Sequence, residues 1–510
     1  MREVWSRDHS VDIILKKHAM VSGSRYRWSR FVLPFEMDGS FFLYHTFTRQ
    51  CLQAGEELRI RPVLRSGYEP DYGEDGTGIY MSEDTLNARF SFDEVSDDPV
   101  LRKLAEDSFL IPEQKDETES YLSVLRLLRI RARKKGYDGY MILPTLGCNA
   151  RCFYCYEEGR QQVSMSPETL DRAIAFILAT RRKNTELHLK WFGGEPLLRP
   201  DVIDAVCSAM RENGVEYRSS IITNGSLITD EILSKMSGDW HLKKIQISMD
   251  CAEPEYILRK NYYRYEDTYK RVIKSAEKLA RAGIAVSIRC NMDEENMDQI
   301  PVFISDLEKM IHDKNNIMVY LAPLNESRKK VNSLRLQQRI FDSRELIERA
   351  GFRSTGTANL NRFKLNYCMA DRPSGYAVIT PSGELYTCEH CEPGTSYGNI
   401  FQGTTRPDIL NSFQNTGNSA DDIRQKCRNC IFLPECTPFS KCPTQEYYCG
   451  EDKKDRILYS LRRKAGVRES RLQMRPEDEQ GDFCCRIITI HIEQTPYLFM
   501  PLIGCGQVMW

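Results

Sequence analysis

Three cysteines within one short stretch, Cys148, Cys152 and Cys155, directly follow the apolar run 141–144. Thiolates are soft ligands that favour zinc, copper(I) or iron–sulfur clusters. A [4Fe–4S] cluster usually takes four cysteines, so three cysteines from one loop would leave one iron open to a ligand that is not protein. The residues alone also allow a zinc knuckle or three buried thiols.

The spacing Cys148-x3-Cys152-x2-Cys155, with Tyr154 before the third cysteine, resembles the radical SAM superfamily. The resemblance implies that the open iron binds S-adenosylmethionine (AdoMet), and that Tyr154 lies in the cofactor site. It also implies that one electron from the cluster yields a 5′-deoxyadenosyl radical, which takes hydrogen from a substrate. The longer pattern PTxxCNxxCxYCYE over residues 144–157 most resembles the branch of the superfamily that modifies peptides and proteins.

The length and the composition of the chain indicate a globular protein of several domains. A length of 510 residues favours two to four domains, and 41% hydrophobic with 28% charged residues is typical of soluble proteins. The net charge of −1 gives no reason to expect nucleic acid as a partner. No apolar run is long enough for a membrane span, and residues 11–15 are too short for a signal-peptide core.

The chain contains 18 cysteines, which without a secretion signal favour metal ligands over disulfides. We therefore expect a protein of the reducing cytoplasm that has no membrane partner. Four cysteines outside the motifs are expected to be ordinary small apolar residues. These are Cys51, Cys207, Cys290 and Cys505.

Residues 1–113 are predicted to form a small α+β domain that resembles a winged helix. Asp38-Gly39 marks a hairpin turn between two strands in residues 30–44, and short helices are expected at 83–88 and 99–106. In peptide-modifying radical enzymes a domain at this position often binds the leader of a precursor peptide, although a packing domain without a ligand is the alternative. A linking helix follows over 114–136, and its basic end offsets the helix dipole.

Strands and helices alternate over residues 137–350, which predicts an α/β fold with a parallel sheet, as a partial (β/α)6 barrel. One helix has a clear start, with Ser166 as N-cap and Pro167 at the first position. The chemistry of such a sheet is expected at the carboxyl ends of its strands. The predicted strands are 139–144, 187–192, 217–223, 243–249, 284–290 and 317–322.

Residues suited to cofactor binding follow these strands in order. The resemblance implies that the GGEP motif binds the methionine amino group of AdoMet, and that a serine and an arginine bind its carboxylate. It also implies that two asparagines contact the ribose or position the cofactor. Asp250 ends a segment resembling the motif QISLDG, although Cys251 replaces its glycine. These residues are Gly193, Gly194, Glu195 and Pro196; Ser248 with Arg259 or Arg289; Asn224 and Asn291; and Asp250.

A second cysteine set begins at residue 368 and resembles the SPASM extension of radical SAM enzymes, which implies two auxiliary [4Fe–4S] clusters in a domain over 351–465. The gap 437–441 is two residues longer than usual in that pattern, and residues 466–510 remain unassigned. The fourth inner ligand is open: either one iron has no cysteine, or Cys391 closes the cluster. A zinc ribbon is the alternative. The implied outer ligands are Cys427, Cys430, Cys436 and Cys449, and the implied inner ligands are Cys368, Cys388 and Cys442.

Glu389 directly follows Cys388. In the sulfatase-maturating relatives an acidic residue at this place is the proton acceptor, so the resemblance implies that Glu389 is the base of a two-electron oxidation. His390 is a competing base, and a plain loop carboxylate is the other alternative.

Together these features predict a radical SAM/SPASM enzyme with three [4Fe–4S] clusters. The expected substrate is a ribosomally synthesised peptide, the expected reaction is a thioether crosslink, and the expected electron donor is a reduced flavodoxin or ferredoxin. Two alternatives remain: a formylglycine-forming, sulfatase-maturating enzyme, and a non-catalytic zinc or iron–sulfur protein.

Overall fold

The computed structural model describes most of the first 435 residues. The predicted helix over 83–88 lies almost entirely outside the described residues, as do the turn at 38–39, the tail from 466, and Cys368, Cys436, Cys442 and Cys449. Within the described part of the chain, no helix is both long enough and apolar enough to cross a membrane. The described residues are 2–5, 20, 22–37, 40–54, 71–72, 79–80, 87–132, 135–155, 157, 159–263, 267–324, 334–354, 363, 365, 369–370, 375–414, 421, 423, 427–428 and 430–435.

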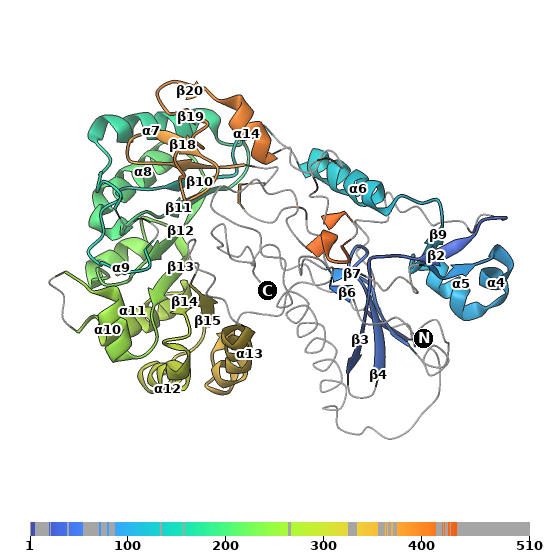
Figure 1. Ribbon diagram of the computed structural model, residues 1–510. Helices are drawn as coiled ribbons and strands as arrows, with labels where there is room; N and C mark the ends of the chain where they lie inside the picture. The colour runs from blue at the N-terminus through green and yellow to red at the C-terminus, as the bar shows by residue number, and fades with distance from the viewer. Residues whose placement is uncertain are drawn as a thin grey trace, which may run out of the picture.

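The largest element is a sheet whose six central strands run parallel in chain order, with helices between them (Figure 1). This confirms the predicted α/β alternation and is consistent with a partial barrel. The strands are β10 (Gly139–Ile142), β11 (Leu187–Trp191), β12 (Tyr217–Thr223), β13 (Leu242–Met249), β14 (Ala285–Met292) and β15 (Ile317–Pro323). The helices are α7 (Pro167–Thr180), α8 (Pro200–Glu212), α9 (Asp230–Ser237), α10 (Glu253–Lys260), α11 (Thr268–Arg281), α12 (Ile300–Met310) and α13 (Leu334–Arg349).

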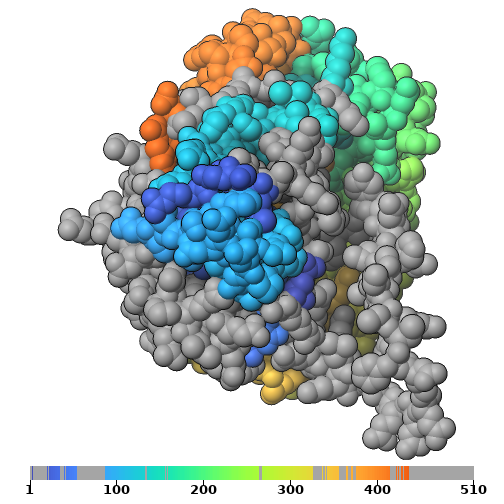
Figure 2. Space-filling view, turned by 90° about the vertical axis from the view of Figure 1, so that its right-hand side faces the viewer, coloured from blue at the N-terminus to red at the C-terminus, as the bar shows by residue number. Residues whose placement is uncertain are grey.

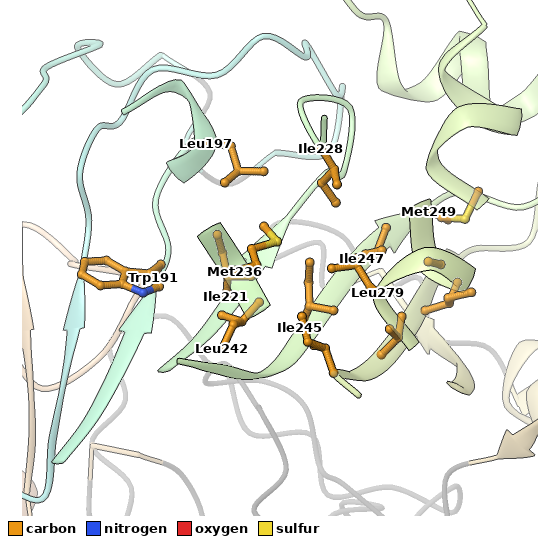
Figure 3. Close-up of a cluster of buried hydrophobic side chains, with 14 of the residues drawn as sticks. Trp191, Leu197, Ile221, Ile228, Met236, Leu242, Ile245, Ile247, Met249 and Leu279 are labelled. Carbon is orange, nitrogen blue, oxygen red and sulfur yellow. The ribbon is translucent and has the colours of Figure 1, made fainter. Parts of the chain in front are cut away.

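Side chains along β13 alternate between an apolar face and a polar one. Ile245, Ile247 and Met249 of β13 are fully buried in the main core, and Figure 3 shows them beside Leu279 of α11. Burying a side chain of this size contributes about 1.5–3 kcal/mol. The intervening side chains of β13 point to the opposite face, because successive strand residues alternate. The main core therefore covers one face of the sheet at β13, and the polar side chains of this strand lie on the other face.

Local signals explain where the helices begin. The Ser166 hydroxyl accepts a hydrogen bond from the Thr169 N–H at 3.1 Å, and Pro167 is the first residue of α7, as predicted. Cys207 and Cys290 are buried in the main core, which confirms them as small apolar residues. Cys51 is buried in the same way in the core of the N-terminal part.

The sheet continues beyond the barrel into the cysteine-rich region. β17 (Tyr376–Ile379) runs parallel to β10, and three short antiparallel strands extend the sheet from there: β18 (Glu384–Tyr386), β19 (Gly398–Asn399) and β20 (Gly403–Thr404). α14 (Pro407–Gln414) follows, and β16 (Arg353–Ser354) forms the opposite edge. The region that carries Cys388 is thus joined directly to the first barrel strand.

The described N-terminal residues form three small antiparallel sheets, and the predicted pair of strands within 30–44 is present. One sheet has the order β1 (Arg2–Trp5), β5 (Cys51–Ala54), β4 (Ser40–His45), β3 (Val32–Met37). Another has the order β8 (Arg89–Phe90), β2 (Tyr26–Trp28), β9 (Leu110–Pro112), and in the third β6 (Asp71–Tyr72) pairs with β7 (Ile79–Tyr80). The helix α5 (Pro99–Glu106) lies where it was predicted, and α4 (Phe92–Asp97) is an additional helix.

Residues 427–435 pack against this N-terminal part. Ile431 and Phe432 are buried in the same core as Trp28 and Leu43. Close by, Arg49 and Glu435 form a fully buried ion pair. The helix α6 (Glu117–Ala132) runs beside these elements, and Figure 2 shows the N-terminal residues on the face toward the viewer. The two ends of the described chain are therefore packed together.

Candidate active site

The three predicted cysteines lie in the loop that follows β10. Cys148 and Cys152 are half-buried and Cys155 is exposed. The Cys155 N–H donates to the Cys152 carbonyl at 3.0 Å, which closes a tight turn. Burial raises the pKa of Cys148 to about 12 and that of Cys155 to about 11, and the neighbouring thiols add to both shifts. A bound metal reverses this preference because it binds the thiolate form.

The donor chemistry of this loop fits an iron–sulfur cluster, since three thiols from one turn are close enough to influence one another's charge. Among the described residues, no three Cys, His, Asp or Glu side chains are arranged to share a single metal ion.

The paired glycines after β11 lie directly on the backbone of the cysteine loop. A Cβ on Gly193 would stand 2.4 Å from the Thr145 carbonyl oxygen, and one on Gly194 would stand 2.3 Å from that of Gly147. The Glu195 N–H donates to the Gly147 carbonyl at 2.8 Å. At these two glycines the backbone therefore approaches the protein's own cysteine loop closely.

Glu195 is fully buried and ties β11 to β12. Its carboxylate accepts from the Leu197 N–H at 3.0 Å, from the Thr223 hydroxyl at 2.8 Å and from the Asn224 N–H at 2.8 Å. Burial raises the pKa of this carboxyl to about 7. A carboxylate accepts about four hydrogen bonds, so about one acceptor position remains for a ligand such as the predicted ammonium group.

Asn224 connects the end of β12 to the first cysteine. Its side-chain NH2 donates to the side-chain Oδ1 of Asn149 at 2.9 Å and lies 3.9 Å from the Cys148 sulfur. Asn149 in turn donates to the Ser226 hydroxyl at 2.8 Å. Asn224 thus positions the cysteine loop, a contact that the strand-end pattern alone did not specify.

A buried polar network joins the cysteine loop to β13, β14 and α10. The Tyr154 hydroxyl donates to the Asp250 carboxylate at 2.6 Å, and the Asn291 amide donates to the Tyr154 hydroxyl at 3.1 Å. Lys260 pairs with Asp250 at 3.0 Å. The structure therefore brings together three of the predicted residues and adds Lys260. No sequence pattern indicated Lys260, because a lysine at a helix end normally faces solvent.

The two candidate arginines differ in what they already bind. Arg259 is buried and forms a two-point ion pair with Asp293, at 2.7 and 2.8 Å, and a second pair with Glu255. Arg289 lies beside Ser248 in the register of β13 and β14. Its Nε is buried without a hydrogen-bond acceptor among the described residues. These contacts favour Arg289 over Arg259 as the partner of a ligand carboxylate.

Glu389 lies in the loop after β18 and is only 4% exposed. Its Oε2 is buried and has no hydrogen-bond donor in the part of the chain that the structure describes. Lys190 of β11 is also buried; burial lowers its pKa, and the charges of Glu389 and Cys388 oppose that shift. Lys190 is a second residue that the sequence did not single out, because its strand reads as an ordinary buried segment.

The competing base, His390, is held through its backbone. Its N–H donates to the Cys388 sulfur at 3.5 Å, and its carbonyl accepts from Arg160 at 2.6 Å. Because Arg160 follows the first cysteine loop, this bond links the two cysteine regions. Of the second cysteine set, the described residues contain Cys388, Cys427 and Cys430, together with the open candidate Cys391.

Comparison with known proteins identifies the domain that carries these residues. Residues 142–307 match the family model described as the radical SAM superfamily. The chain therefore contains a radical SAM domain, in agreement with the predicted resemblance. AdoMet and an iron–sulfur cluster are the cofactors of such a domain.

Particular relatives differ in how much of the chain they match. A probable GTP 3′,8-cyclase of Methanothermobacter marburgensis is 34% identical over 123 residues, which is 22% of this chain and 37% of that protein. The radical SAM cyclopropyl synthase TigE of Paramaledivibacter caminithermalis is 23% identical over 440 residues, which is 78% of this chain and 86% of that protein. The solved structure of anSMEcpe with bound AdoMet and the Kp18Cys peptide has a TM-score of 0.51 at 16% identity, covering 65% of this chain and 99% of that one.

Proposed function

We propose that the protein is a radical SAM/SPASM peptide maturase, which joins a cysteine sulfur of a ribosomally synthesised peptide to a carbon of a neighbouring residue. The observation that carries this proposal is the three-cysteine loop, which is held at the strand ends by Asn224 and by the network of Tyr154, Asp250 and Lys260. Geometry of this kind is needed to hold a substrate close to a reactive group.

Different residues of the chain would bind the cluster and AdoMet. Cys148, Cys152 and Cys155 would hold the first cluster, and Ser248 with Arg289 would bind the carboxylate of AdoMet. When bound, the cofactors supply a hydrogen-abstracting radical and take up the one electron that the oxidation releases. The remaining proposed contacts to AdoMet are the GGEP segment and the pair Asn224 and Asn291.

Glu389 is the proposed base. The substrate C–H gives up its hydrogen atom, the cysteine thiol gives up its proton to Glu389, and the S–C bond then forms as one electron leaves. The buried Oε2 that lacks a donor among the described residues supports this role, because it can accept a proton. Lys190 is the proposed cationic neighbour of this base, because it is buried and the negative charge of Glu389 opposes the lowering of its pKa.

Two comparisons bear on the proposed substrate, and the one with anSMEcpe supports a peptide. The similarity to TigE extends over 78% of this chain, well beyond the radical SAM domain. The fold is also shared with anSMEcpe, which was solved with a peptide bound. We assign binding of the precursor's leader to residues 1–113 and binding of the auxiliary clusters to residues 351–465. The radical chemistry is assigned to residues 137–350. The match to a GTP cyclase covers only 123 residues, and it supports the domain without supporting that substrate.

The cofactor part of the proposal is tested on anaerobically purified protein. We expect about twelve irons per chain if all three clusters hold four, and release of 5′-deoxyadenosine when reduced protein receives AdoMet. Cys152→Ala should release none. Cys207→Ala is the matched control, since Cys207 is buried in the core away from the loop, and it should behave as wild type. Colourless protein with bound zinc would instead identify the non-catalytic alternative.

The substrate part is tested by mass spectrometry. A short cysteine-containing peptide encoded beside the gene should lose two hydrogens and its free thiol. Glu389→Gln should still release 5′-deoxyadenosine but form little crosslink. Conversion of a sulfatase peptide to formylglycine would establish the runner-up, and turnover of GTP would contradict a peptide substrate altogether.

A further inference from the structure

A second cysteine pair, Cys388 and Cys391, occupies one tight turn after β18. The Cys391 N–H donates to the Cys388 carbonyl at 3.2 Å, and the His390 N–H donates to the Cys388 sulfur at 3.5 Å. Cys391 has a φ of 45°, in the left-handed region that residues other than glycine seldom adopt. Strain of this kind persists where the surroundings impose it, and functional sites are common among such places.

The same turn occurs at the two other cysteine pairs of this spacing among the described residues. The second cysteine donates its N–H to the carbonyl of the first at 3.0 Å in Cys152–Cys155 and at 3.2 Å in Cys427–Cys430. Both of those pairs are assigned to clusters by the sequence patterns, whereas Cys391 lies outside them. The backbone around Cys391 therefore has the form of the turns that present thiolates to a cluster.

Backbone N–H groups also point at sulfur in all three regions. The Ala150 N–H lies 3.4 Å from the Cys148 sulfur, and the Phe432 N–H lies 3.4 Å from the Cys430 sulfur. A hydrogen bond to the charged form stabilises it. The bond from His390 to Cys388 places the third turn in the same class.

The surroundings of Cys391 suit a ligand that is shielded from water. Cys391 is 8% exposed and packs with Met141, Leu143, Val378 and Tyr386 on the face of the sheet opposite the main core. Its thiol donates to the Cys388 carbonyl at 3.6 Å, within the same turn. Two cysteines of one turn, one of them buried among apolar side chains, are suited to bind one cluster.

We propose that Cys391 is an iron–sulfur ligand and that it binds the same auxiliary cluster as Cys388. This inference rests on the auxiliary clusters of the proposed function. Together with the three inner cysteines that the sequence pattern implies, Cys391 supplies the fourth thiolate and leaves that cluster no open iron. A substrate thiol would then have no iron to bind there, and its deprotonation would fall to Glu389.

The test compares Cys391→Val, which keeps an apolar side chain of similar size, with Cys391→Ser, which keeps a weaker oxygen ligand. If Cys391 is a ligand, the Val variant should lose up to four irons per chain, or should show a changed EPR spectrum after reduction. The Ser variant should keep the cluster with shifted EPR signals. Added cyanide should perturb the spectrum of the Val variant and leave the auxiliary signals of wild type unchanged.

Cys207→Val is the control, because Cys207 is also buried but belongs to α8 and lies in the main core. It should retain wild-type iron and spectra. A Cys391→Val variant with full iron and an unchanged spectrum would show that Cys391 serves packing alone. If that variant does not fold, an unshifted spectrum of Cys391→Ser would overturn the proposal equally. An iron content of only about four per chain in the wild-type protein would instead show that it has no auxiliary clusters, which would contradict the proposed function itself.

Discussion

At the scale of single residues, the site depends on buried polar groups that satisfy one another. Asp250 is fully buried, and Lys260 is its cationic partner. Removing one partner of a buried pair leaves an uncompensated charge, which costs far more than the pair contributes. The motif predicted Asp250 and Tyr154, but the lysine that neutralises them became visible only when α10 was placed against the loop.

Lys260→Met should destabilise the protein by about 3–5 kcal/mol, because it leaves the Asp250 carboxylate buried without its cation. Urea unfolding measures this change. Lys278→Met is the matched control, since Lys278 pairs with Asp230 at 2.6 Å on the exposed surface, where a pair contributes about 0–1 kcal/mol. Equal losses in both variants would contradict a special role of the buried pair.

His45 is a buried residue whose charge is suppressed by its surroundings. Its Nε2 lies 3.1 Å from the Ser108 carbonyl, so it donates there, and its Nδ1 accepts from the Thr48 N–H at 3.2 Å. Burial lowers the pKa of this imidazole to about 3. In the unfolded chain the ordinary pKa is about 6.5.

Stability should therefore fall as the pH decreases below 6.5, because the unfolded chain then binds a proton at His45 that the folded chain does not bind until about pH 3. The contribution is fully present above pH 6.5 and decreases by about 1.4 kcal/mol per pH unit. Thermal unfolding at pH 5 and pH 7 should show a smaller difference for His45→Gln than for wild type. His312→Gln, at an exposed position, should retain the wild-type difference.

At the scale of elements, the hydrophobic periodicity and the residues at strand ends predicted the parallel strands well. The six parallel strands lie within about two residues of their predicted bounds. The extension through β17 to β20 was not predicted, because strands of two to four residues carry too few alternations to be recognised. The same limit applies to α4, because its six residues are too few to show a clear helical periodicity.

The contact between the β11 loop and the cysteine loop predicts a strong effect for Gly194→Ala. The added Cβ would meet the backbone of Leu146 and Gly147, which cannot rotate away. The cysteine loop must then shift, so the variant should bind less iron and release less 5′-deoxyadenosine.

Gly214→Ala provides the control for a glycine substitution as such. It strains a residue at φ 61° but meets no atom within 4 Å. It should cost roughly 1–2 kcal/mol of stability and leave the iron content unchanged. Full iron in Gly194→Ala would show that the loop tolerates displacement.

At the scale of the whole molecule, the N-terminal part is joined to the segment 427–435 through buried contacts. The Arg49 guanidinium pairs with Glu435 and also donates to the Pro434 carbonyl at 3.0 Å. The Thr46 hydroxyl donates to the Ile431 carbonyl at 2.6 Å. Sequence patterns could not predict this contact, because the partners are separated by almost 390 residues.

Glu435→Ala should weaken the contact between the N-terminal part and the segment 427–435, because it leaves Arg49 buried without its carboxylate partner. The expected cost is about 3–5 kcal/mol, and limited proteolysis should cut the N-terminal part faster than in wild type. Glu113→Ala, which breaks the partly exposed pair with Arg89, should be cut at the wild-type rate. Identical cleavage of both variants would show that the Arg49 pair does not hold the two parts together.

The supports of the first cysteine loop come from far along the chain. The Arg151 N–H donates to the Lys260 carbonyl at 2.9 Å, and the Tyr263 N–H donates to the Asn149 carbonyl at 2.9 Å. During synthesis more than a hundred further residues must emerge before these supports exist. The cysteine loop therefore acquires its full backbone support only after the segment through Tyr263 has been made and has packed against it.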